Sequence, residues 1–132
     1  MMTEKKNKCA TELGVKMINK VLKILYSHRF PLLVEKETQA AIEQKLVDNG
    51  IIEYSREHKL DEQNIPDFFI DGSIAVEVKI KGNAKQIYRQ CERYCQFEEV
   101  KKLILVTNRS MGFPEKINGK DCYMVNLGKA WL

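Results

Sequence analysis

The sequence lacks a long hydrophobic segment, internal repeats and low-complexity tracts. No apolar run among its 132 residues approaches the roughly 18 residues that a membrane-spanning helix needs. The first residues, MMTEKKNKCATELG, are charged and lack the apolar core of a signal peptide. A chain of this length without repeats is typical of one domain that buries a substantial core. We therefore expect a single domain over residues 11–132, located in the cytoplasm and without a membrane partner.

Cysteine is too scarce and too unevenly spaced to predict a disulfide framework. Cys9 lies near the N-terminus and Cys122 in a predicted strand, far from any partner in the sequence. This pattern is typical of a reducing compartment. Cys91 and Cys95 could supply half of a zinc site, but no second pair lies at ligand spacing. Because both continue an apolar row that begins at Ile87, we favour packing in the core.

Positive charge is concentrated near the N-terminus. Residues 1–30 carry seven basic and two acidic side chains, whereas the remainder carries 15 basic and 16 acidic ones. A basic region of this kind can bind a polyanion such as nucleic acid. For residues 1–10 the alternative is a polar, partly disordered tail that serves solubility.

The spacing of apolar residues predicts a mixed α/β domain around one sheet. Apolar residues recur every four positions from Leu13 to Leu25, which indicates an extra N-terminal helix with Thr11 as its N-cap. The segment 108–119 contains two glycines and a proline and is predicted to be a loop with at most one helical turn. The predicted helices cover residues 11–28, 34–48 and 84–97, and the predicted strands cover residues 51–57, 67–70, 73–80, 102–107 and 121–126.

The stretch IPDFFIDGSIAVEVKIKG is the most informative part of the chain. Asp67 opens a short strand, a turn follows, and the next strand carries Glu77 and Lys79 on one face, because residues i and i+2 of a strand point the same way. The hairpin can bring Asp67 beside them. Two carboxylates suit Mg²⁺ or Mn²⁺, an ion that activates water for phosphodiester hydrolysis, and Lys79 can stabilise the developing charge. The alternative is an exposed edge strand, but the apolar opposite face favours a more central one.

A third carboxylate should come from the second predicted helix, where Glu35, Glu37 and Glu43 are candidates. On a helical projection Glu35 lies about 20° from the inward-facing Ile42, whereas Glu37 lies about 140° away. We favour Glu35 and keep Glu37 as the alternate, because the start of the helix is uncertain.

The third predicted helix adds two polar rows at i, i+4 spacing. An amide and phenol row can reach the site or the scissile phosphate, and a basic row can follow a phosphate backbone. The alternative for the basic row is a solvated helix face. The rows consist of Gln86, Gln90 and Tyr94, and of Lys81, Lys85, Arg89 and Arg93.

Pro66-Asp67 followed by Glu77-Val78-Lys79, between an upstream helical glutamate and a downstream Gln-x-x-x-Tyr, resembles the PD-(D/E)xK nuclease superfamily. The resemblance covers about residues 34–107 and implies a restriction-endonuclease-like core, with a mixed central β-sheet flanked by helices in the order αβββαβ. The small size and the VEVK strand look most like stand-alone VRR-NUC proteins and archaeal Holliday-junction resolvases. The glutamine–tyrosine pair is more similar to RecB-type nucleases and phage exonucleases.

The resemblance also implies a role for each matching position. Asp67 and Glu77 would bind Mg²⁺ or Mn²⁺, with the Val78 carbonyl as a further candidate ligand. Lys79 would be the catalytic lysine, and Glu35 would orient water or the metal. The positions that would support the site or the DNA are Gln90 and Tyr94.

The function we expect is metal-dependent hydrolysis of DNA, as a structure-specific endonuclease in phage or mobile-element DNA processing. A homodimer is expected for an enzyme that cuts two strands and needs two sites. The alternatives are an end-dependent RecB-type exonuclease and a catalytically silent nucleic-acid-binding module.

Overall fold

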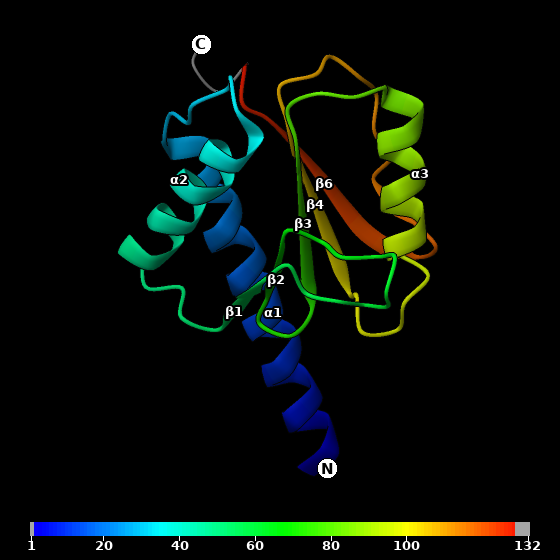
Figure 1. Ribbon diagram of the computed structural model, residues 1–132. Coiled ribbons are helices and arrows are strands. Elements are labelled where there is room, and N and C mark those ends of the chain that lie inside the picture. The colour runs from blue at the N-terminus through cyan, green and yellow to red at the C-terminus, as the bar shows by residue number, and fades with distance from the viewer. Residues whose placement is uncertain (1, 129–132) are drawn as a thin grey trace.

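The computed structural model describes residues 2–128 and, within the first helix, side chains from Val15 onward. Two helices, three strands, a third helix and three further strands follow one another along the chain and form an α/β domain (Figure 1). No helix in this described part is long and apolar enough to cross a membrane. The elements are α1 (Met2–Ser27), α2 (Glu35–Asp48), β1 (Tyr54–Arg56), β2 (Phe68–Ile70), β3 (Ile74–Lys79), α3 (Ala84–Tyr94), β4 (Lys102–Thr107), β5 (Lys116–Ile117) and β6 (Lys120–Asn126).

The six strands form one mixed sheet in the order β1-β2-β3-β4-β6-β5. β3, β4 and β6 are parallel to one another, whereas β1–β2, β2–β3 and β5–β6 are antiparallel pairs. The central strand β4 is the apolar run KLILVT, and its residues from Leu103 onward are all buried. A continuous apolar run is what a parallel strand needs when helices cover both of its faces.

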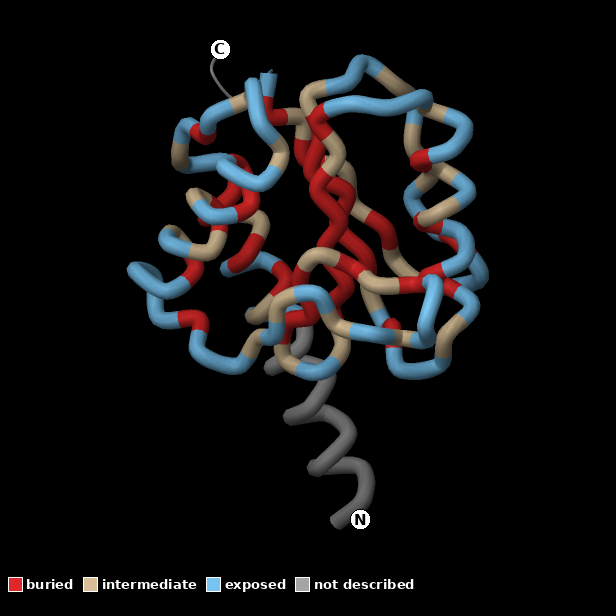
Figure 2. Tube along the Cα trace, in the orientation of Figure 1, coloured by how far each residue is buried: buried red, intermediate tan, exposed pale blue. Residues whose placement is uncertain are grey.

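Helices cover both faces of the sheet: α1 and α2 pack on one and α3 on the other (Figure 1). Ile74, Val76 and Val78 belong to the core beneath α1 and α2, whereas Ala75 belongs to the core beneath α3. The predicted alternation of β3 is therefore confirmed. The strands form the buried centre of the domain, while the outer surfaces of the helices are exposed (Figure 2).

The first helix begins earlier than the sequence predicted. α1 starts at Met2, so the predicted helix start at residue 11 is wrong and Thr11 lies inside the helix instead of capping it. The segment from Met2 to Leu13 contains no proline or glycine and is rich in lysine and glutamate, which are good helix formers.

Other boundaries differ by a few residues, and one strand is new. β1 is shorter than predicted because Ile51 packs into the core before the strand begins, and α3 ends at Tyr94 instead of residue 97. The predicted loop 108–119 has no helical turn among its residues, all of which are described, and instead contains β5. Asn118 and Gly119 form the hairpin turn to β6, with φ of 52° and 76°. The dipeptide Asn-Gly is the strongest short-range hairpin signal in sequences.

The prediction that Cys91 and Cys95 pack in the core is confirmed. Both lie beneath α3 with Ile87 and Cys122, and the Sγ atoms of Cys95 and Cys122 are 4.0 Å apart. All three cysteines in this core are free thiols. Cys9 lies among the residues whose side chains are not described.

Candidate active site

The β2–β3 hairpin has strands of unequal length, which leaves one edge of β3 open. β2 pairs only with Ile74–Val76, whereas β3 continues to Lys79. If the same register continued, Pro66 would lie opposite Val78, but proline has no N–H to donate and the Pro66 carbonyl instead accepts the His58 N–H at 3.2 Å. The last residues of β3 therefore need other partners for their backbone groups on that side.

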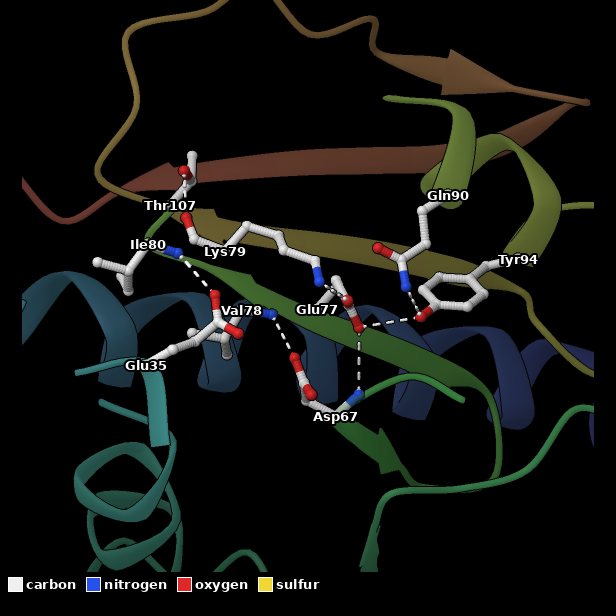
Figure 3. Close-up of polar contacts among 9 residues, drawn as sticks. All are labelled: Glu35, Asp67, Glu77, Val78, Lys79, Ile80, Gln90, Tyr94 and Thr107. Carbon is white, nitrogen blue, oxygen red and sulfur yellow. Dashed lines mark hydrogen bonds and ion pairs between the residues drawn. The ribbon is translucent and has the colours of Figure 1, made fainter. Parts of the chain in front are cut away.

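Two carboxylates take the place of a strand at this open edge (Figure 3). The Val78 N–H donates to Asp67 Oδ2 at 2.7 Å, and the Ile80 N–H donates to Glu35 Oε1 at 3.0 Å. Asp67 immediately precedes β2, and Glu35 is the first residue of α2. Two elements far apart in the sequence thus place their carboxylates on backbone donors that would otherwise be unpaired.

Glu77 connects Asp67 to Lys79 and Tyr94 (Figure 3). It would lie opposite Asp67 in the continued register and is only 2% exposed. Its Oε1 accepts hydrogen bonds from the Asp67 N–H at 3.3 Å and the Tyr94 hydroxyl at 3.1 Å, while its Oε2 lies 3.2 Å from Lys79 Nζ. Gln90 Nε2 donates to Tyr94 Oη at 2.8 Å. The prediction that the hairpin brings Asp67 beside Glu77 and Lys79 is therefore confirmed.

Asp67 and Glu77 hold their protons more tightly than usual, because their pKa values are raised. Burial, and then the negative charge of Asp67, raise the pKa of Glu77 to about 8. Burial likewise raises the pKa of Asp67, although the Val78 N–H and Lys79 oppose the shift. For Lys79, burial alone would lower the pKa, but the carboxylates of Glu77, Glu35 and Asp67 together outweigh it and the pKa is raised. One ammonium thus faces three carboxylates, and a further cation would relieve their mutual repulsion.

The oxygen donors suit a hard divalent cation. Asp67 and Glu77 supply carboxylates, and the Val78 carbonyl points to the same edge as its N–H, because both groups of a strand residue face the same neighbour. Among the described residues, no group of three or more His, Cys, Asp or Glu side chains is arranged as a complete ligand set. Two carboxylates and a carbonyl fit Mg²⁺ or Mn²⁺, since Mg²⁺ usually keeps several of its waters.

In the presence of a chelator, the free energy of unfolding should fall as the pH rises from 4.5 to about 8. In this window the folded protein keeps a proton on Glu77 that the unfolded chain has released, so raising the pH favours unfolding. Asp67 acts in the same direction, and Lys79 titrates above the window. Denaturant unfolding at a series of pH values would measure the slope. Glu77→Gln should flatten it, and equal slopes for the two proteins would contradict the raised pKa.

The structure distinguishes Glu35 from Glu37 and shows which members of the two polar rows line a pocket. Glu37 is exposed, whereas Glu35 is half-buried and bonded to Ile80, so the prediction that Glu35 faces the sheet is confirmed. Lys85 is exposed and lies outside the pocket that the other members of its row border. The members of the two rows that line this pocket are Lys81, Gln86, Arg89, Gln90 and Arg93.

Two supporting residues were missed from the sequence. The Thr107 hydroxyl donates to the Lys79 carbonyl at 2.6 Å, and Asn64 Oδ1 accepts from Arg93 Nε at 3.2 Å. Thr107 could have been found, because parallel β3 and β4 end side by side and Thr107 pairs with Lys79. Asn64 lies in the loop between β1 and β2, whose sequence has no periodic pattern from which its contacts could be predicted.

The chain matches no protein-family model, and no curated protein or solved structure matches it.

Proposed function

We propose that this protein is a metal-dependent nuclease of the PD-(D/E)xK type that hydrolyses phosphodiester bonds in DNA. The observation that carries the proposal is the meeting of Asp67, Glu77 and Lys79 at the open edge of β3, with Glu35 at the same edge. Hard oxygen ligands beside a lysine suit the hydrolysis of a phosphodiester.

The arrangement of elements supports a restriction-endonuclease-like core. α2, β1, β2, β3, α3 and β4 follow one another in the order αβββαβ. β1 to β3 form an antiparallel meander, and β3 then pairs in parallel with β4 after the crossover through α3. In this order Asp67, just before β2, lies near Glu35 of α2, and Glu77 of β3 accepts a hydrogen bond from Tyr94 of α3.

Each residue has a distinct role in the proposed reaction. Asp67, Glu77 and the Val78 carbonyl would hold Mg²⁺ or Mn²⁺. When bound, such an ion lowers the pKa of water and offsets negative charge at the phosphate. Lys79, half-buried between Glu77 and the adjacent pocket, stabilises charge that develops on the phosphate. Tyr94 holds Glu77 Oε1 in place through its hydroxyl, which fixes the direction of that carboxylate.

The preferred substrate class is branched or flapped DNA, cut by a homodimer with two sites; the alternative nuclease is an end-dependent exonuclease. A second candidate function is a catalytically silent nucleic-acid-binding module. It is favoured by the fact that Asp67 and Glu35 already satisfy backbone donors of β3, which gives both carboxylates a structural purpose without catalysis.

A cleavage assay tests the proposal. Labelled linear, single-stranded, flapped and four-way-junction DNAs would be incubated with Mg²⁺ or Mn²⁺, with and without chelator. Cleavage that requires the metal supports the nuclease, and the panel identifies its substrate. Binding of these DNAs without cleavage under any metal condition would favour the silent module instead.

Glu35 and Glu37 provide a matched pair of substitutions on one helix. Glu35→Gln should lower the cleavage rate on the order of 10- to 100-fold, the usual effect of losing a group that orients a metal site. Glu37→Gln should leave the rate unchanged, because its side chain is exposed. Single-turnover rates on the preferred DNA would measure both. Equal losses in the two variants would rule out a specific role for Glu35.

A further inference from the structure

A pocket of about 460 Å³ lies between the end of β3 and α3. It adjoins the carboxylate cluster, because Lys79 lines the pocket and is also ion-paired with Glu77. Its walls come from the segment that links β3 to α3 and from one stripe of α3. This position places the pocket beside the proposed reaction centre.

The lining of the pocket is strongly positive. Four of its residues are basic, and no acidic residue lines it. Among the residues whose side chains are described, no carboxylate forms an ion pair with Lys81 or Arg89. The four basic residues are Lys79, Lys81, Arg89 and Arg93.

The amphipathic pattern of α3 explains this concentration of charge. Ile87, Cys91 and Tyr94 are the buried face of the helix. The polar stripe beside that face, with Gln86 and Arg93 near its two ends, turns toward the pocket. These positions recur at three- and four-residue intervals, so they lie along one side of the helix.

The pocket suits phosphate groups better than bases. No aromatic side chain lines it, and proteins that hold the bases of single strands usually stack them on aromatic rings. From Asn83 to Arg93 the wall extends about 15 Å along the helix. Successive phosphates advance by about 3.4 Å along the axis of a duplex strand. A wall of this length therefore suits a run of phosphates better than a single terminal one.

We propose that this pocket binds the phosphate backbone of one DNA strand next to the scissile bond, without reading its sequence. The proposal rests on the proposed nuclease function, because it assigns the pocket to the substrate of the neighbouring site. Lys81 and Arg89 contact backbone phosphates, and Lys79 lies between the bound strand and the carboxylates. Arg93 contributes charge while its Nε is held by Asn64.

DNA binding at several salt concentrations, in the presence of chelator so that no cleavage occurs, tests this assignment. Fluorescence anisotropy would compare the parent with Lys81→Ala and Arg89→Ala, using an oligothymidylate and a mixed-sequence oligonucleotide of equal length. Each substitution should lower the slope of log K against log salt by about 1. The affinity should fall by the same factor for both sequences. Lys101→Ala removes an exposed lysine outside the pocket and should keep the parental slope.

The outcomes separate this inference from the nuclease proposal. Parental slopes in Lys81→Ala and Arg89→Ala, or a loss confined to one sequence, would overturn the pocket assignment even if the protein cleaves DNA. The expected loss of slope in a protein that never cleaves would uphold the binding of backbone phosphates in the pocket and refute the nuclease. Both residues are exposed, so the variants should fold, and thermal unfolding would verify this.

Discussion

Replacing Lys79 with methionine is expected to lower the rate of metal-dependent DNA cleavage on the order of 10²- to 10³-fold, the usual effect of removing one group that stabilises a transition-state charge. Methionine keeps the apolar stem of the side chain but has no charge. The Lys79 ammonium lies 3.2 Å from Glu77 Oε2, and Lys79 also lines the basic pocket. No other cation among the described residues both pairs with Glu77 and lines this pocket. Single-turnover cleavage of the preferred DNA would measure the loss.

Lys101→Met is the matched control for this substitution. Lys101 is exposed just before β4, at the opposite end of the sheet from the carboxylates, and its replacement should leave the rate unchanged. Lys79→Arg keeps the charge with a different shape and should retain part of the activity. If Lys79→Met cleaves DNA as fast as the parent, the nuclease proposal loses its catalytic lysine.

Replacing Ile104 with alanine is expected to lower the free energy of unfolding by about 2–5 kcal/mol, the cost of a cavity in a packed core. Ile104 lies in the central strand β4 with 0% exposure, in the core beneath α1 and α2. β3 and β6 flank this strand on either side, so the surroundings have little freedom to collapse into the space. Because small domains are stable by only about 5–15 kcal/mol, this loss should be plain in denaturant unfolding.

Ile52→Ala is the matched control, because it makes the same substitution at an exposed position. Ile52 is 84% exposed, and Ile52→Ala should alter the free energy of unfolding by no more than about 0.5 kcal/mol. Comparable losses in Ile52→Ala and Ile104→Ala would mean that β4 is not at the centre of the core. A substitution at Ile104 also leaves every polar group of the candidate site intact, so its effect on activity should follow stability alone.

Local periodicity was enough to predict the elements that position the site. The alternation from Ile74 to Ile80 fixed which side chains of β3 face each core, and the helical projection of α2 distinguished Glu35 from Glu37. Both arguments depend only on the geometry of a single element. The Gln90 and Tyr94 pair was likewise correctly placed next to the site, since Tyr94 bonds to Glu77.

Features that depend on contacts between elements could not be predicted in the same way. The hydrogen bond from the Ile80 N–H to Glu35 joins residues 45 positions apart, and it exists only because β2 stops short of the end of β3. Lys85 was grouped with the basic row because i, i+4 spacing does not show where a pocket ends. β5 was missed although Asn118-Gly119 is a hairpin signal, because two-residue strands have too little pattern to detect.

The candidate site depends on Pro66 as well as on its carboxylates, because Pro66 lies where the pairing of β2 with β3 ends. If another residue stood there, its N–H could pair with the Val78 carbonyl. If its carbonyl also moved from the His58 N–H to the Val78 N–H, β2 would extend and Asp67 would lose the donor that orients it. The hairpin would then become ordinary sheet with the same acidic residues still present. A substitution at Pro66 could therefore disable the proposed site without altering any charged side chain, and a sequence comparison restricted to the carboxylates and the lysine would not detect the change.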